Sequence, residues 1–233
     1  MRVWLLLISL VFLANASISK STKQLIVVKT SSWSAKHGNL QRYEKSRNVW
    51  RKVGKQISVK VGKKGLGWGK GLHQTPRGAK YIKREGDKKA PAGIFGLKFA
   101  FGYSKYSTQY PYRVMGRNNR CVDDGNSKYY NKIIDIKKSR QDYRSFENMR
   151  LKSNLYSYGI VIDHNPKAIR GAGSCIFMHI QKSNGKSTVG CTAMRVNDIK
   201  AIIKWLQPSK HPLLIQAPKS EIKNLLPSGI KVY

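Results

Sequence analysis

The amino-acid sequence predicts a single, mainly β domain with a few short helices. Short runs of β-branched and aromatic residues recur along the chain, and turn-forming clusters of glycine, proline, asparagine and aspartate separate them. Only one segment shows a clear helical period, and no repeat or linker divides the 233 residues. Because 40% of the residues are hydrophobic, the chain is able to bury a core, and many short strands favour a β-sandwich or barrel.

The expected strands are apolar runs between polar turns. They cover residues 24–28, 40–43, 49–53, 57–61, 94–101, 158–163, 174–181 and 213–215. In the run 174–181 successive side chains alternate, so Cys175, Phe177 and His179 share one face. Residues 65–71, with a glycine at every second position, predict a tight connection, and residues 121–127 predict a loop.

The clearest helix follows Asn197. Its apolar residues fall at the i, i+3, i+4 and i+7 positions of one helical face, namely Ile199, Ile202, Ile203 and Leu206. Asn197 is expected to cap the first turn, and Pro208 marks the end. A shorter helix is expected at residues 220–226.

Residues 1–16 predict a secretory signal peptide. A single Arg2 precedes an apolar stretch too short to span a bilayer, and Ala14-x-Ala16 forms a cleavage site. A retained N-terminal anchor is the alternative. We expect a catalytic domain over residues 24–217 and a C-terminal extension, residues 218–233, packed on that domain. The mature chain is then expected in the periplasm or cell envelope, without a transmembrane segment.

The chain is strongly basic, with 45 Lys and Arg residues against 11 Asp and Glu residues. Such a charge concentrates a protein on polyanions. Because export is expected, anionic envelope polymers are a better match than nucleic acid, for which no recognised motif is present. A composition bias without any dedicated partner is equally compatible with the charge.

Three cysteines in an exported chain leave at least one thiol without an intramolecular partner. Cys191 is the one expected to be free. Cys121 and Cys175 are expected either to form a disulfide or to remain as two buried thiols.

His179 and Cys191 are the candidate catalytic pair. Eleven residues separate them and contain the turn signal Asn184-Gly185, so we expect the two to lie on neighbouring strands of one hairpin. An imidazole beside a cysteine lowers the thiol pKa and activates it for acyl transfer. The amides of Gly190 and Cys191 are natural oxyanion donors, and a backbone carbonyl is expected to orient the imidazole.

A metal centre is the chemical alternative, because His and Cys both bind zinc. However, the chain has no Cys-x-x-Cys or His-Glu-x-x-His pattern, and its five histidines are scattered, so no metal and no cofactor is expected. His164, after the strand 158–163, either lines the cleft or lies on a surface loop. The adjacent Asp123 and Asp124 are expected to cap a loop rather than to bind a cation.

The residues 158–159, 171–179 and 187–194 resemble the L,D-transpeptidase catalytic domain (YkuD-like). The segment Thr188-Val189-Gly190-Cys191-Thr192-Ala193 is similar to the branch of the family with a Thr-x-Gly-Cys-x-Ala motif. The resemblance covers residues 24–217.

This resemblance implies a β-sandwich enzyme of the bacterial wall that acts on peptidoglycan stem peptides. Its cysteine attacks the carbonyl of the third residue, D-alanine leaves, and an amine resolves the thioester. By position, Cys191 is the nucleophile and His179 the base. Gly190, Thr188, Ser187 and His164 are weaker candidates for oxyanion or substrate binding.

The sequence departs from the commoner family motif at two positions. Val189 stands where a histidine is frequent, and Ala193 stands where an arginine is frequent. The missing arginine puts carboxylate recognition in doubt, and Arg195, Arg170 or a lysine are candidates to replace it. Two rival functions remain: hydrolysis of the thioester, as in an L,D-carboxypeptidase or amidase, and a non-catalytic, basic wall-binding module.

Overall fold

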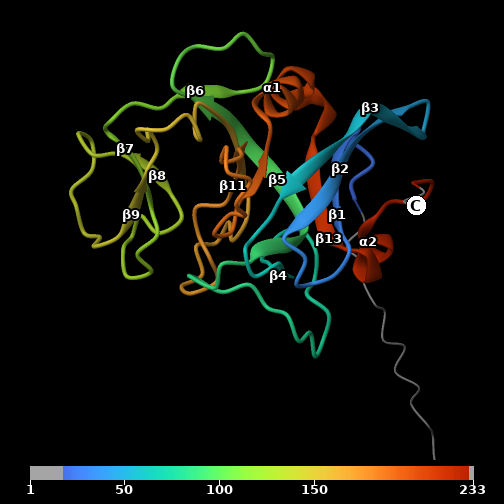
Figure 1. Cartoon of the computed structure of the whole chain (residues 1–233), viewed down its shortest axis with the longest axis horizontal. Coiled ribbons are helices and arrows are strands. Elements are labelled where there is room, and N and C mark those ends of the chain that lie inside the picture. The colour runs from blue at the N-terminus through green and yellow to red at the C-terminus, as the bar shows by residue number, and fades with distance from the viewer. Residues whose placement is uncertain (1–17, 231–233) are drawn as a thin grey trace, which may run out of the picture.

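The computed structural model describes residues 18–230, and the expected signal peptide lies outside this range (Figure 1). Within it the chain is mainly β, as the sequence predicts. The strands are β1 (Gln24–Thr30), β2 (His37–Ser46), β3 (Val49–Lys60), β4 (Leu66–Trp68), β5 (Ala90–Gly102), β6 (Tyr112–Val114), β7 (Asn119–Val122), β8 (Ile133–Asp135), β9 (Phe146–Asn148), β10 (Tyr158–Ile162), β11 (Phe177–Ile180), β12 (Thr192–Met194) and β13 (Leu213–Pro218).

The main sheet closes on itself. Its ten strands run in the order β10-β11-β12-β3-β2-β1-β13-β5-β4, β6 joins β5, and β10 also pairs with β5. The pairing of β10 with β5 joins the first strand of this path to the last but one, so most strands have a neighbour on each side. Inside the closed sheet lies an apolar core that includes Ile26, Val59, Phe95 and Met178.

Two predicted strands, 49–53 and 57–61, are one long strand. β3 continues through Gly54, which has a φ of 65°. This glycine and the register shift between Leu40 and Arg42 bend the β2–β3 pair without ending it. The glycine-rich segment 65–71, predicted as a connection, contains β4, which pairs in parallel with the start of β5.

A second, three-stranded sheet of order β8-β7-β9 forms a separate lobe, on the side of the molecule away from α2 (Figure 1). Cys121 and Val122 belong to β7, so the predicted loop 121–127 begins two residues later than expected. The lobe has a small core of its own, in which Val122 packs against Ile134 and Tyr143. The chain is too polar here for alternation to reveal the strands.

Helix α1 (Val196–Trp205) buries Ile199, Ile202 and Ile203, as the helical period predicts. Its N-cap is Arg195, not Asn197, and the Arg195 guanidinium pairs with Asp198 at 2.9 Å. A 3-10 turn, η1 (Pro208–Lys210), follows.

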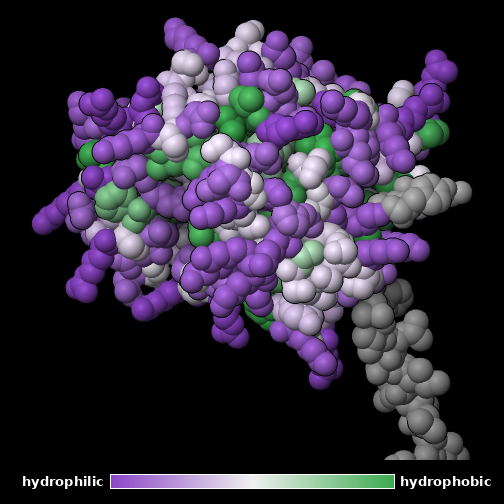
Figure 2. Space-filling model, viewed as in Figure 1, coloured by the Kyte–Doolittle hydropathy of each residue, from purple (hydrophilic) through white to green (hydrophobic). Residues whose placement is uncertain are grey.

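Helix α2 (Lys219–Leu225) packs Ile222 into an apolar cluster with Leu25 and Ile215. No helix of the described residues is long and apolar enough to cross a membrane. The face seen in Figure 2 is predominantly hydrophilic, with small, scattered apolar patches.

Candidate active site

The strand that carries His179 and the strand that begins directly after Cys191 are parallel, so the predicted hairpin is wrong. His179 of β11 lies opposite Ala193 of β12, and Met178 lies opposite Thr192. The turn at Asn184-Gly185 exists, with Gly185 bonded back to Lys182. After it, however, Thr188 exchanges backbone hydrogen bonds with Val61 and Lys63 beyond the end of β3. The chain thereby returns to the start of β11 before β12 begins.

Strand β11 is shorter than the predicted run 174–181. Gly173 and Cys175 have φ angles of 101° and 53°, which break the extended conformation just before Phe177. From Phe177 onward the alternation holds. Met178 and Ile180 face the main core, and Phe177 packs in a second cluster with Cys175 and Cys191.

His179 and Cys191 line one cavity of about 120 Å³. Ser187, Thr188 and Val189 form part of its wall, as do Tyr156 and Leu155. The cavity adjoins a wider groove of about 820 Å³, because Leu155 and Lys182 line both. The structure therefore brings the predicted nucleophile and base together at a depression that a substrate is able to reach.

The imidazole of His179 has a defined tautomer. Its Nδ1 lies 2.7 Å from the carbonyl oxygen of Ile180, and because a carbonyl only accepts, Nδ1 carries the proton. The orienting group is a backbone carbonyl, as expected. Nε2 is left unprotonated and is the basic atom. Burial lowers the His179 pKa to about 4, the Ile180 carbonyl opposes this shift, and nearby Lys182 adds to it.

Burial raises the pKa of the Cys191 thiol, and the charge of Glu147 raises it further. The amide of Phe177 donates to Sγ at 3.3 Å, and Lys83 also favours the thiolate, but both effects are smaller. The expectation of a lowered thiol pKa is therefore wrong for the substrate-free protein. Buried at 4% exposure, Cys191 rests as a neutral thiol beside a neutral imidazole.

The Cys191 thiol donates its hydrogen bond to a backbone carbonyl and not to the imidazole. Its Sγ donates to the carbonyl of Cys175 at 3.7 Å, and no hydrogen bond of the described residues joins it to His179. Catalytic hydrogen bonds are commonly long in a substrate-free enzyme and tighten in the complex. Proton transfer to Nε2 therefore requires rotation of the thiol away from Cys175.

Of the two amides predicted as oxyanion donors, one is already engaged in a hydrogen bond. The Gly190 amide donates to Thr188 Oγ1 at 3.2 Å, and the Thr188 hydroxyl donates to the Cys191 carbonyl at 2.6 Å. Thr188 therefore holds the loop around the nucleophile, and the Gly190 amide is already engaged. The Cys191 amide, with no hydrogen-bond partner among the described residues, is the better donor.

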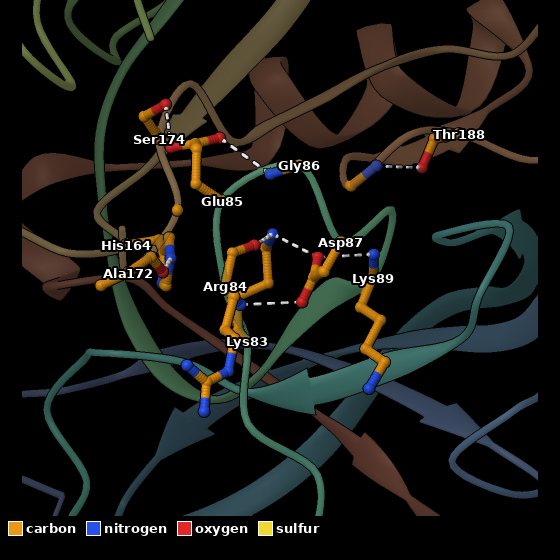
Figure 3. A network of polar contacts seen from close by, with 12 residues as sticks. Lys83, Arg84, Glu85, Gly86, Asp87, Lys89, His164, Ala172, Ser174 and Thr188 are labelled. Atoms are coloured by element: carbon orange, nitrogen blue, oxygen red, sulfur yellow. Dashed lines mark hydrogen bonds and ion pairs between the residues drawn. The ribbon is translucent and has the colours of Figure 1, made fainter. Parts of the chain in front are cut away.

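A partly buried polar network holds the segment before β11 (Figure 3). Glu85 accepts hydrogen bonds from Ser174 at 2.7 Å and from Tyr130 at 2.5 Å. In the same loop, Asp87 pairs with the buried Lys83 at 2.7 Å and accepts from two backbone amides.

A disulfide joins Cys175 to Cys121, and Cys191 remains the free, buried cysteine. The sequence left open whether Cys121 and Cys175 form a disulfide or remain two buried thiols, and in the structure they form the disulfide. The disulfide thus joins the three-stranded lobe to Cys175, and the Cys175 carbonyl accepts a hydrogen bond from the Cys191 thiol.

The family model of the L,D-transpeptidase catalytic domain (YkuD) matches residues 23–215. The chain belongs to this family. No curated protein and no solved structure matches the chain.

His164 does not line the cavity that holds His179 and Cys191, and it is not on a surface loop either. It is 1% exposed, with Nε2 donating to the Ala172 carbonyl at 3.0 Å and Nδ1 accepting from the Lys70 amide at 3.3 Å (Figure 3). Burial lowers its pKa to about 4. His164 therefore supports the fold beside the site.

Sequence reasoning missed two residues next to the candidate pair, Tyr156, which lines the cavity, and Glu147, which bonds to Tyr156. The Tyr156 ring packs edge-on against the His179 ring, with centroids 5.2 Å apart, and its hydroxyl donates to Glu147 at 2.8 Å. Both lie in the polar stretch 137–157, where no local pattern distinguishes them. The described residues contain no group of His, Cys, Asp and Glu side chains suited to a metal ion.

Proposed function

We propose that this member of the family is an exported wall enzyme that forms a thioester on Cys191. The observation that carries the proposal is the fixed His179 imidazole, which lines the same small cavity as the only free thiol of the described residues. The family as a whole acts on peptidoglycan stem peptides. Export and a location in the periplasm or cell envelope follow from the N-terminal sequence pattern.

The proposed reaction has two acyl-transfer steps. His179 Nε2 takes the thiol proton as Sγ attacks the carbonyl of the third residue of a stem peptide, and the Cys191 amide stabilises the oxyanion. The C–N bond to the terminal D-alanine then breaks, and the imidazolium protonates the departing amine. An amine of a second stem attacks the thioester, its proton passes to His179, and the thiol is regenerated.

The groove beside the cavity supports an acidic peptide as substrate. Lys55, Lys182 and Arg195 line it, and its one carboxylate, Asp198, is already paired with Arg195. Lys182 lies at the junction with the catalytic cavity, so it is the best candidate to bind a substrate carboxylate in place of the motif arginine that Ala193 replaces. The high net charge favours anionic envelope polymers as a second class of partner.

Intact-mass analysis with a disaccharide-tetrapeptide tests the proposal. The wild type should gain the mass of the muropeptide less D-alanine, and Cys191→Ala should show no adduct. His179→Ala should slow product formation by about a thousandfold, whereas His37→Ala, at an exposed histidine outside the site, should match the wild type.

The products distinguish the rivals. Cross-linked or exchanged products identify a transpeptidase, and a free tripeptide identifies a hydrolase. Wall binding that Cys191→Ala leaves unchanged, without adduct or product in the wild type, would show a binding module instead.

A further inference from the structure

Three contacts of the fold connect Glu147 to Cys191, the proposed nucleophile. It sits on β9 opposite Cys121 of β7, and Cys121 is bonded to Cys175. The Cys175 carbonyl in turn accepts a hydrogen bond from the Cys191 thiol. One strand pairing, one covalent bond and one hydrogen bond thus connect Glu147 to the sulfur.

Tyr156 forms a second connection, to the base. Its hydroxyl donates to a Glu147 carboxylate oxygen, while its ring packs against the His179 imidazole and lines the catalytic cavity. Burial and the charges of Glu147 and Cys191 hold the Tyr156 pKa well above its usual range, so the hydroxyl stays protonated as the donor.

The charges around Glu147 are unusual for so basic a chain. Although only 11 of the 233 residues are acidic, Asp123 and Glu85 both lie close enough to raise the Glu147 pKa. With burial as the larger cause, and despite the Tyr156 hydrogen bond, that pKa reaches about 7. The charge of Lys83 therefore favours the Cys191 thiolate, and the charge of an ionised Glu147 opposes it.

We propose that Glu147, together with Tyr156, is a positioning residue that controls when Cys191 releases its proton. A protonated Glu147 leaves only Lys83 acting on the sulfur, and thiolate formation is easier. An ionised Glu147 places a like charge near the sulfur and suppresses the thiolate. The consequence for turnover rests on the proposed role of Cys191 as nucleophile, but thiol reactivity is measurable without any wall substrate.

Alkylation by iodoacetamide tests this inference. Because Cys121 and Cys175 form a disulfide, Cys191 is the cysteine available to the reagent. Rates would be measured from about pH 5 to about pH 10 for the wild type, Glu147→Gln and the matched control Glu221→Gln. Glu221 lies on α2, across the molecule from β9 (Figure 1).

Above pH 7, Glu147→Gln should react faster than the wild type by about tenfold, since one nearby like charge shifts a pKa by roughly one unit. Glu221→Gln should follow the wild type. Equal or slower alkylation in Glu147→Gln would overturn the proposal.

Tyr156→Phe provides a second test, because a purely structural role of Tyr156 would not change the pH dependence of alkylation. Without the hydroxyl, Glu147 should ionise at higher pH, so the inflection near pH 7 in the wild-type alkylation profile should move upward. An inflection that stays in place contradicts the inference, even if Glu147→Gln fails to fold. If the alkylation profile shifts but Cys191 forms no thioester with muropeptides, the proposed function is refuted and this inference stands. If muropeptides are turned over but the alkylation profile does not shift, this inference is refuted and the proposed function stands.

Discussion

Removal of the Cys121–Cys175 disulfide should destabilise the domain strongly. The bond closes a loop with a sequence separation of 54 that begins within β7 and contains β8, β9 and β10. The chain-entropy model for a loop of this length gives about 14 cal/mol/K, which is about 4 kcal/mol at 25 °C. The lobe formed by β7, β8 and β9 has only a small core, so the disulfide supplies much of the order of this region.

Urea unfolding of the double variant Cys121→Ala/Cys175→Ala measures this contribution. Its free energy of unfolding should fall by about 4 kcal/mol relative to the wild type. The matched control is Cys191→Ala, which removes a cysteine but keeps the disulfide and should lose about 1 kcal/mol for a small buried side chain. A double variant within about 1 kcal/mol of the wild type would refute the reasoning.

Two further predictions concern the surroundings of the nucleophile. Thr188→Ala should cost about 1 to 2 kcal/mol and slow Cys191 acylation, because it removes the hydroxyl that bonds the Cys191 carbonyl and the Gly190 amide; Thr188→Ser should retain both. His164 and His179 both have pKa values lowered to about 4 from 6.5. The unfolded chain binds more protons between these values, so stability should fall as the pH drops from about 6.5 to about 4, by about 3 kcal/mol per histidine. Chemical denaturation of His164→Gln across this range should show a shallower loss, and an unchanged slope would contradict the assignment.

The sequence revealed the elements whose side chains follow a clear period. The apolar run at 24–28, the helical spacing from Ile199 to Leu206 and the alternation from Phe177 to His179 each correspond to an observed element. The candidate pair was also found from the sequence, because His179 ends a strand and Cys191 follows a glycine. The resemblance to the family then gave each residue a role.

The two errors that matter most for the site, the predicted hairpin and the missed Glu147, come from tertiary contacts between distant segments. The segment around Thr188 bonds to Val61 and Lys63, more than a hundred residues earlier, and this pairing makes β12 parallel to β11. No local turn signal encodes that contact. The same holds for Glu147, which reaches the site through the disulfide between Cys121 and Cys175.

The pKa shifts of the candidate pair explain how a cysteine with an adjacent histidine remains unreactive in the resting protein. Burial acts in opposite directions on the two groups, raising the pKa of the Cys191 thiol and lowering that of the His179 imidazole. At neutral pH the resting pair is therefore uncharged, and a thiol reacts with oxidants and disulfides far more slowly than a thiolate does.

In the reaction proposed above, the charge pair has to form during the attack of Cys191 on its substrate. A substrate carbonyl near Sγ supplies an electrophile at the moment His179 Nε2 accepts the proton, so thiolate character develops only as the thioester bond forms. Above neutral pH, the charge of an ionised Glu147 disfavours the Cys191 thiolate further, and the charge of Lys83 offsets part of this effect. The buried charges thus favour a nucleophile that responds to its bound substrate rather than to any electrophile that reaches the cavity.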